Sequence, residues 1–233
     1  MSLSVHTLFS DITALFFPKN CAVCGKPLLR QEKILCTSCY YRLPFTGFFD
    51  EKENPVTEIF MARLPLVFAS SLLFFNKGGM AQQLIHQLKY DGKKEIGSFL
   101  GKLIGIALQG SPFISDVDII LPVPLHPKKE HQRGYNQSYL IGRAMAEQIE
   151  IPVSGEVLFR KVYTATQTKK SRYERWQNVK DIFAVKNENL IRNKHVLLVD
   201  DVITTGATLE ACGNELIKIP GVRLSIVSAA YAQ

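Results

Sequence analysis

The sequence predicts an α/β protein, with a largely parallel β-sheet flanked by helices and a small metal-binding module in front of it. In the larger, C-terminal part of the chain, short apolar runs of strand length alternate with longer segments of helical periodicity. This alternation is typical of βαβ units. Several of the runs are almost continuously apolar, as expected of strands buried on both faces of a parallel sheet. Near the N-terminus, four of the five cysteines form two CxxC pairs.

The composition agrees with an ordinary globular protein. The chain has 233 residues, enough for one sizeable core or for one core and a small additional module. Hydrophobic residues make up 46% and charged residues 21%. No apolar run reaches the roughly 18 residues that a membrane span requires. The net charge of +7 is compatible with nucleic acid or with phosphorylated ligands as partners.

The N-terminal segment is predicted to be a short amphipathic helix rather than a signal peptide. Its start lacks basic residues, and Asp11 interrupts the apolar run. Leu8, Ile12, Leu15 and Phe16 recur at helical spacing. We therefore expect the protein to stay in the cytoplasm and to have no membrane span.

The two CxxC pairs predict a metal site with the ligands Cys21, Cys24, Cys36 and Cys39. Four thiolates suit a tetrahedral structural zinc ion, and an iron–sulfur cluster is the main alternative. Disulfides are disfavoured in a cytoplasmic chain. The loop between the pairs is shorter than the 15–20 residues of one common zinc-ribbon spacing. A closed site of four cysteines leaves no open coordination position, so we expect a role in folding or contact rather than in catalysis.

The segment that follows is predicted to be a linker, because it mixes aromatic and polar residues with turn formers. We expect the larger domain to begin near Leu64, which divides the chain into residues 1–63 and residues 64–233. In the second part the apolar patterns predict strands over 65–75, 117–124, 157–162, 181–185, 196–199 and 223–232. They predict helices over 78–92, 96–108, 136–149 and 207–219. The fifth cysteine, Cys212, falls in the last helix, where we expect it to be part of the core.

The stretch VLLVDDVITTGAT, residues 196–208, carries the main functional signal. Asp200 and Asp201 follow an apolar strand, at the edge where parallel sheets bind their ligands. Adjacent carboxylates cost free energy unless a cation or a set of donors compensates them. The segment 204–208 opens a helix, whose free amides and dipole suit a phosphate group. The stretch therefore predicts a clamp for ribose 5-phosphate, with the acids on the sugar hydroxyls and the loop on the phosphate.

Other interpretations of the acid pair are weaker. A Walker B strand would be accompanied by a GxxxxGK[ST] loop, and the sequence contains none. An acid pair of the response-regulator type is expected at an early strand rather than at the last helix–strand unit. Helix capping by Thr204 or Thr205 would not explain two adjacent acids.

The residues of three segments resemble a known family. VLLVDDVITTGAT resembles the phosphoribosyl pyrophosphate (PRPP) signature of type I phosphoribosyltransferases along its whole length. LPVPLHPKKEHQRGYNQS (121–138) and TATQTKKSRYERWQNV (164–179) resemble two further marks of the ComF family. This family comprises competence-associated, phosphoribosyltransferase-like proteins with an N-terminal four-cysteine zinc module. The resemblance extends from Cys21 to the last strand. It implies a type I phosphoribosyltransferase-like fold with a zinc-ribbon-like module and a role in DNA uptake.

The resemblance also implies roles for individual residues. Asp200 and Asp201 would bind the ribose 2′- and 3′-hydroxyls, directly or through Mg²⁺. The 5′-phosphate would lie on Thr204, Thr205, Gly206, Ala207 and Thr208. The loop 122–126 would lie where the pyrophosphate group binds, and Arg133, with Asn136 beside it, would reach that group.

The basic segment 164–178 has more than one interpretation. The resemblance implies a lid that closes over PRPP and brings Lys170 and Arg175 to the leaving group. The same segment could be an exposed basic loop. It could also contact single-stranded nucleic acid, because its basic residues alternate with Tyr173 and Trp176, which can stack on bases. The histidines show no pattern, and we expect them to be structural or solvated (His86, His126, His131 and His195).

Three functions remain open from the sequence. The first is a phosphoribosyltransferase in which an unidentified acceptor displaces pyrophosphate from ribose C1. Mg²⁺ and the basic groups would neutralise the leaving group, and the catalytic residues would be Asp200, Asp201, Arg133, Lys170 and Arg175. The second is a non-catalytic adaptor that binds single-stranded DNA or protein and works with a helicase-like ATPase in DNA uptake. The third is a regulatory PRPP sensor that binds without turnover.

Overall fold

The structure is a computed structural model of the whole chain, and it describes residues 19–161 and 182–232. The expected N-terminal amphipathic helix lies outside the described residues. So do Lys170 and Arg175 and the rest of the basic segment 164–178.

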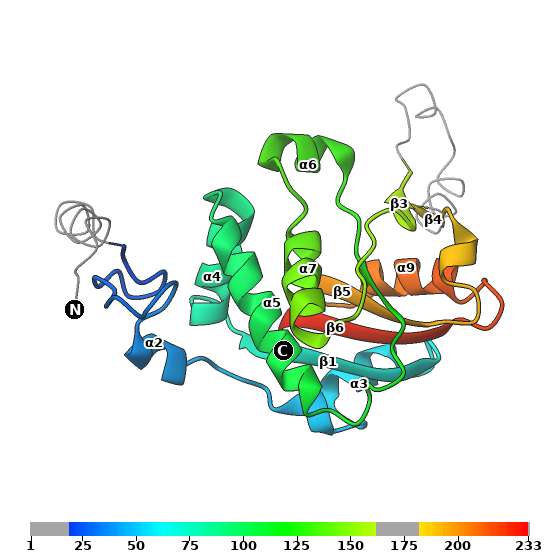
Figure 1. The fold of residues 1–233 in the computed structure, drawn as a ribbon, viewed down its shortest axis with the longest axis horizontal. Coiled ribbons are helices and arrows are strands. Elements are labelled where there is room, and N and C mark those ends of the chain that lie inside the picture. The colour runs from blue at the N-terminus through cyan, green and yellow to red at the C-terminus, as the bar shows by residue number, and fades with distance from the viewer. Residues whose placement is uncertain (1–18, 162–181, 233) are drawn as a thin grey trace, which may run out of the picture.

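A sheet of four parallel strands forms the centre of the molecule (Figure 1). Its order is β1-β6-β5-β2, with β1 at Leu66–Phe75, β6 at Arg223–Ala232, β5 at His195–Ile203 and β2 at Ile119–Pro122. Nearly all residues of β5 and β2 are buried, because helices cover both faces of the sheet. This confirms the largely parallel α/β sheet that the continuous apolar runs predict.

Two helical layers cover the sheet, one on each face. Alternate residues of β5 supply the two cores: Leu197 and Val199 belong to one, and Val196 and Leu198 to the other. The first core is completed by α4 (Met80–Tyr90), α5 (Lys94–Gln109) and α7 (Gln137–Ile149). The second is completed by α3 (Pro55–Phe60) and α9 (Ala207–Leu216). The functional edge is therefore built on a rigid three-layer body.

Helices α5 and α7 pack unusually closely. A Cβ atom on Gly101 of α5 would lie 2.2 Å from the carbonyl oxygen of Ile141 in α7, well inside van der Waals contact. Only a glycine allows the two backbones to approach in this way. The contact fixes α7, whose first turn reaches the acid pair.

Shorter elements extend and protect the sheet. Residues 152–154 run beside β2, with the Ile120 N–H donating to the Pro152 carbonyl over 2.8 Å. Beyond them, β3 (Leu158–Arg160) and β4 (Phe183–Val185) form a separate antiparallel pair, and the short helix η3 covers Glu188–Leu190. Helix α6 (Pro127–Arg133) projects from the body at the top of Figure 1.

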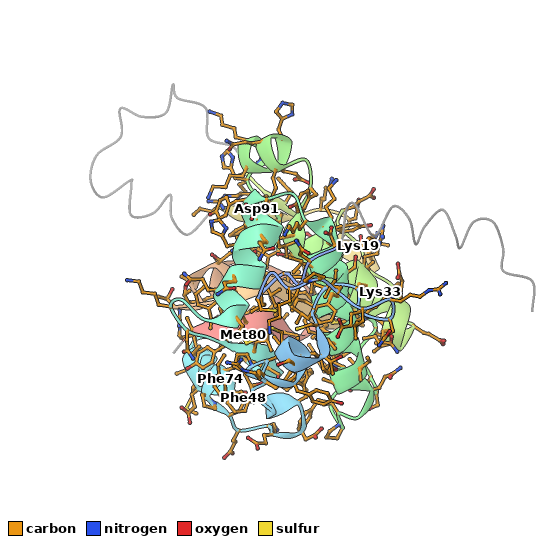
Figure 2. All side chains as sticks on the ribbon, turned by 90° about the vertical axis from the view of Figure 1, so that its left-hand side faces the viewer. Lys19, Lys33, Phe48, Phe74, Met80 and Asp91 are labelled. Atoms are coloured by element: carbon orange, nitrogen blue, oxygen red, sulfur yellow. The ribbon has the colours of Figure 1, made fainter. Side chains whose placement is uncertain are left out.

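The N-terminal module packs against the same body. Figure 1 shows the cysteine loops and α2 (Thr37–Tyr41) beside α4, and Figure 2 views this side directly. Cys21 and Cys39 lie in the core that contains α4 and α5. The Gln87 side chain of α4 donates to the Ala22 carbonyl over 2.5 Å.

The predicted linker folds along β1. The Phe74 N–H donates to the Pro44 carbonyl over 2.8 Å, and the ring of Phe48 in helix η1 (Phe48–Asp50) meets that of Phe74 edge to face. Figure 2 labels both residues. Asn54 caps α3 and its amide donates to the Ala69 carbonyl of β1 over 2.9 Å. These contacts attach the linker to the sheet.

The elements agree with most of the sequence-based predictions. All strands and helices predicted between residues 65 and 232 are present, with shifted ends. Strand β5 continues past VLLV to Ile203, because its pairing with β6 continues to Tyr231. Helix α9 ends at Leu216 and not at residue 219. The short helices α2, α3 and α6 were not predicted. No helix in the described ranges is both long and apolar enough to cross a membrane.

Candidate functional site

The acid pair lies near the carboxyl end of β5 and is almost completely buried. Asp200 is 9% exposed and Asp201 is 4% exposed. The Ser138 hydroxyl of α7 donates to Asp200 Oδ1 over 2.9 Å, and the Asp201 N–H donates to the same oxygen over 2.8 Å. The Lys89 amine of α4 lies 2.8 Å from Asp201 Oδ1. The two neighbouring carboxylates are therefore compensated from two different helices.

Burial, together with the neighbouring charge of Asp201, raises the pKa of Asp200 to about 7. The hydrogen bonds from the Asp201 amide and from Ser138, together with the charge of Lys89, act in the opposite direction. Near neutral pH, Asp200 can thus hold or release a proton.

One carboxylate oxygen of the pair lacks a partner. Asp201 Oδ2 is buried and accepts no hydrogen bond within the described part of the chain. A buried acceptor without a donor is costly and rare, so it indicates a site that a ligand hydroxyl or a cation completes. Carboxylate oxygens are the ligands that Mg²⁺ prefers, so the donor set fits this ion.

The loop after β5 fits an anion. Thr204, Thr205, Ala207 and Thr208 are exposed. Gly206 is the N-cap of α9 with φ +74°, and no side chain caps the helix there. A Cβ atom on Gly206 would lie 2.8 Å from atoms of Ile59 and of Phe60, so both its conformation and its space require glycine. The Ala207 N–H donates to Thr205 Oγ1 over 3.4 Å. The next amides of the first turn and the hydroxyls of Thr204 and Thr208 lie at this exposed helix N-terminus, where an anion can bind.

The segment predicted to bind pyrophosphate forms α6 and its flanks. His126 caps α6, with its Nδ1 accepting from the Lys128 N–H over 3.1 Å, and Asn136 caps α7. Arg133 hydrogen-bonds Gln137 and lies over the ring of Tyr90 at 5.6 Å. Neither of these contacts involves the acid pair. Arg133 lines a cavity of about 500 Å³ between α4 and α6, together with Lys89, Tyr90, Gly92, Lys129, Gln132 and Tyr135.

The four cysteines of the CxxC pairs come together as predicted. Their Sγ atoms all lie within 4.8 Å of one another, and none forms a disulfide. Gly25, with φ +72°, closes the first turn and donates to the Cys21 carbonyl over 3.0 Å.

The thiol pKa values are pushed apart. Burial raises the pKa of Cys39 to about 12, helped by the other three thiols. Burial acts the same way on Cys21, but hydrogen bonds from the amides of Cys24, Cys36 and Val23 outweigh it and lower its pKa to about 6. Such a cluster can hold a metal ion, and four thiolates in this arrangement fit zinc.

Two residues of the site were missed in the sequence. Lys89 and Ser138 lie on helices far from β5 in the chain, and nothing in their local pattern marks them. Among the histidines, His195 was expected to be structural or solvated. It is fully buried, with its Nδ1 2.9 Å from Asp116 Oδ1 and its Nε2 2.7 Å from Ser225 Oγ.

Comparison with known proteins identifies relatives. Residues 135–232 match the phosphoribosyl transferase domain family. Competence protein F of Haemophilus influenzae is 33% identical over 140 residues, which cover 58% of this chain but only 59% of that protein, less than two thirds of its length. The DNA utilization protein YhgH of Shigella flexneri is 30% identical over 209 residues, 85% of this chain and 84% of that protein. Competence protein ComFC of Bacillus subtilis is 25% identical over 201 residues, 85% of this chain and 71% of that protein.

Solved structures with lower similarity include nucleotide-metabolism enzymes. An allosteric regulatory enzyme of purine biosynthesis is 22% identical, with a TM-score of 0.40, over 56% of this chain and 26% of that one. An adenine phosphoribosyltransferase from Leishmania tarentolae is 12% identical, with a TM-score of 0.37, over 78% of this chain and 89% of that one.

Proposed function

The chain belongs to the ComF family of competence proteins and has a type I phosphoribosyltransferase-like fold, and on that premise we propose that it binds PRPP, or a ribose 5-phosphate nucleotide, with Mg²⁺. Its cellular role would be in DNA uptake, in the cytoplasm. In this proposal Asp200 and Asp201 bind the ribose hydroxyls, directly or through the metal. The 5′-phosphate lies on the residues of the α9 N-terminus, Thr204, Thr205, Gly206, Ala207 and Thr208.

The observation that carries the proposal is the incomplete polar shell of the acid pair. Among the described residues Asp201 Oδ2 is buried without a donor. The N-terminus of α9, whose N-cap residue Gly206 offers no capping side chain, begins five residues further along the same segment. Hydroxyl donors or a cation would complete the first, and an anion would complete the second. A sugar phosphate supplies both kinds of group in one small molecule.

The proposed reaction replaces pyrophosphate at ribose C1 by a nucleophile of an unidentified acceptor. Mg²⁺, held by Asp200 and Asp201, would supply positive charge to the diphosphate. The chain's own residues would hold the ribose and its phosphate, and Arg133 would add cationic donors on the leaving-group side. Lys170 and Arg175, which lie outside the described residues, would act on the same group.

Titration calorimetry with PRPP and Mg²⁺ tests the proposal. We expect saturable binding to the zinc-loaded wild type and a loss of at least about tenfold in affinity in Asp200→Asn/Asp201→Asn. Asp50→Asn, an exposed acid on η1, serves as the control and should bind like the wild type. Absence of binding to folded wild type would overturn the PRPP clamp.

Turnover requires a separate measurement. Pyrophosphate release from PRPP in the presence of candidate bases, lost in the double variant, would support a transferase. The names of the relatives mention competence and DNA utilization, which favours a role connected with DNA. The second candidate function is therefore an adaptor that binds single-stranded DNA or a helicase-like ATPase partner. DNA binding that depends on the cysteine module but not on Asp200 would favour this adaptor. Binding of PRPP without turnover, with a change in a partner's activity, would favour a PRPP sensor.

For the cysteine module we propose a structural zinc ion bound by Cys21, Cys24, Cys36 and Cys39. The mutual distances of the Sγ atoms support this proposal. Metal analysis of the purified protein distinguishes one zinc ion per chain from an iron–sulfur cluster.

A further inference from the structure

We propose that Lys89 is a built-in counter-cation of the acid pair, and that a divalent cation replaces it only when a polyphosphate group enters the adjoining cavity. The inference rests on the proposed function, because it concerns the same acid pair. It adds a residue that the sequence motifs do not contain and an order of events at the site.

The ligand-free position of Lys89 is well defined. Its amine lies 2.8 Å from Asp201 Oδ1, and the Lys89 side chain is 24% exposed against 5% for Asp201. The helix end that carries Lys89 is anchored, since the buried Tyr135 hydroxyl donates to the Leu88 carbonyl. A movement of the amine must therefore come from its own flexible stem and not from α4.

The Lys89 side chain lies between the acid pair and a cavity of opposite electrostatic character. On one side it contacts the buried acid pair. On the other it lines the cavity of about 500 Å³ between α4 and α6, which Lys129 and Arg133 also line. Among the described residues, the cavity wall contains three cationic side chains and no carboxylate. The cavity therefore favours an anion with several negative charges, such as the diphosphate of PRPP or another polyphosphate.

The electrostatics couple the two sides. A divalent cation on either oxygen of Asp201 would lie close to the Lys89 amine, which is 2.8 Å from Oδ1, and the amine would repel it unless it leaves. Removing one member of a buried ion pair is costly when the other is left alone. A polyphosphate in the cavity offers Lys89 a new anionic partner, while the divalent cation takes its place on Asp201. The polyphosphate thus gives Lys89 a new partner, and the divalent cation gives Asp201 one. We therefore expect the cation and the polyphosphate to bind together, and the cation alone to bind weakly.

Titration with Mn²⁺ in the absence of any phosphate tests this inference, using electron paramagnetic resonance of the free ion and protein whose cysteine site is filled with zinc. We expect Lys89→Gln to bind Mn²⁺ at least about tenfold more tightly than wild type, because a positive charge next to the acid pair is gone. Lys102→Gln removes an exposed charge on α5 and is the matched control. Lys89→Arg keeps the cation and should exclude Mn²⁺ like wild type.

The tighter Mn²⁺ binding of Lys89→Gln must depend on the acid pair. In Lys89→Gln/Asp201→Asn the tighter Mn²⁺ binding should disappear. If Lys89→Gln binds Mn²⁺ no better than Lys102→Gln, with both proteins folded, the inference is wrong. The PRPP titration above decides the proposed function separately: PRPP binding without the Mn²⁺ gain removes only the inference, and the gain without PRPP binding removes only the function.

A second measurement needs no substitution at Lys89. Amine-reactive labelling, followed peptide by peptide in a mass spectrometer, should modify Lys89 of wild type more slowly than the exposed Lys102. Labelling of Lys89 should accelerate in Asp201→Asn, which removes its partner. Equal labelling of Lys89 and Lys102 in wild type would contradict the ion pair and with it the inference.

Discussion

At the scale of single residues, Asp200 and Asp201 show how one strand places two neighbouring acids in different surroundings. Asp200 receives neutral donors from Ser138 and from a backbone amide, and its pKa is raised. Asp201 receives the charge of Lys89. The pair can therefore carry less negative charge without ligand than two free carboxylates would, which lowers the cost of burying it.

The raised pKa of Asp200 predicts a pH-dependent stability of the ligand-free protein. The folded protein holds the proton of Asp200 more tightly than the unfolded chain, whose Asp residues titrate near about 4. The contribution of Asp200 is therefore fully favourable below about pH 4 and is lost as the pH rises to about 7. We expect Asp200→Asn to raise the free energy of unfolding by about 1–3 kcal/mol at pH 8 and by much less at pH 5. Urea unfolding of wild type and variant at both pH values, without Mg²⁺, measures this difference.

The exposed acid Asp50, replaced by Asn, gives the baseline for this experiment. A difference between wild type and Asp200→Asn that does not change between pH 5 and pH 8 would show that Asp200 is charged throughout. The hydrogen-bond donors of Asp200 would then stabilise its charged form by more than burial destabilises it.

The acids, the loop 204–208 and the four cysteines could be predicted from the sequence, because each group is contiguous or regularly spaced. Lys89 and Ser138 could not. Their role depends on where α4 and α7 cross the end of β5, and only tertiary packing determines that. Arg133 was expected at the pyrophosphate group, and that role stays a prediction. In the structure Arg133 lies with Lys89 at the cavity between α4 and α6.

At the scale of elements, the errors in the sequence-based prediction have local causes. The end of β5 was placed before Asp200 because the apolar run stops there, but pairing with β6 continues through Val202 and Ile203. Helices α3 and α6 are short and lack a full apolar period, so their capping residues are the only features of the sequence that indicate a helix. Both begin with a capping residue followed by proline, Asn54-Pro55 and His126-Pro127, a pattern that favours a helix start.

The cysteine module provides a prediction at this scale. We expect Cys24→Ser to lose most of the bound zinc and to lower the melting temperature by several degrees, because the module packs on α4 and α5. Cys212→Ala removes a buried thiol from α9, outside the cluster, and should keep one zinc ion per chain. Metal content and thermal unfolding of both variants are the measurements. Full zinc content in Cys24→Ser would exclude Cys24 as a ligand.

At the scale of the whole molecule, the body depends on the segment before Leu64. Val56 and Phe60 of α3 are almost completely buried in the core beneath α9, and Phe60 also packs against Gly206 of the candidate phosphate loop. The predicted domain boundary near Leu64 stays a prediction, and the packing of α3 offers a test of it.

Two fragments compare the possible boundaries. We expect residues 44–233 to melt at least about 10 °C above residues 64–233, because burying Val56 and Phe60 contributes several kcal/mol and each kcal/mol shifts the melting temperature by about 2–4 °C. Circular dichroism of both fragments during heating provides the comparison. Equal melting temperatures would support a domain that begins near Leu64 and folds without α3.

The contact between residues 44–46 and β1 has a further consequence for the behaviour of the protein in solution. β1 is the edge strand of the sheet, ten residues long and mostly apolar. Such an edge can pair with a second molecule and start aggregation. The Thr46 N–H donates to the Leu72 carbonyl over 3.0 Å, the Phe74 N–H donates to the Pro44 carbonyl, and Phe45 pairs with Leu73 in antiparallel orientation. The segment thus occupies part of the hydrogen-bonding groups of this edge, so fewer of them are left to pair with a strand of a second molecule.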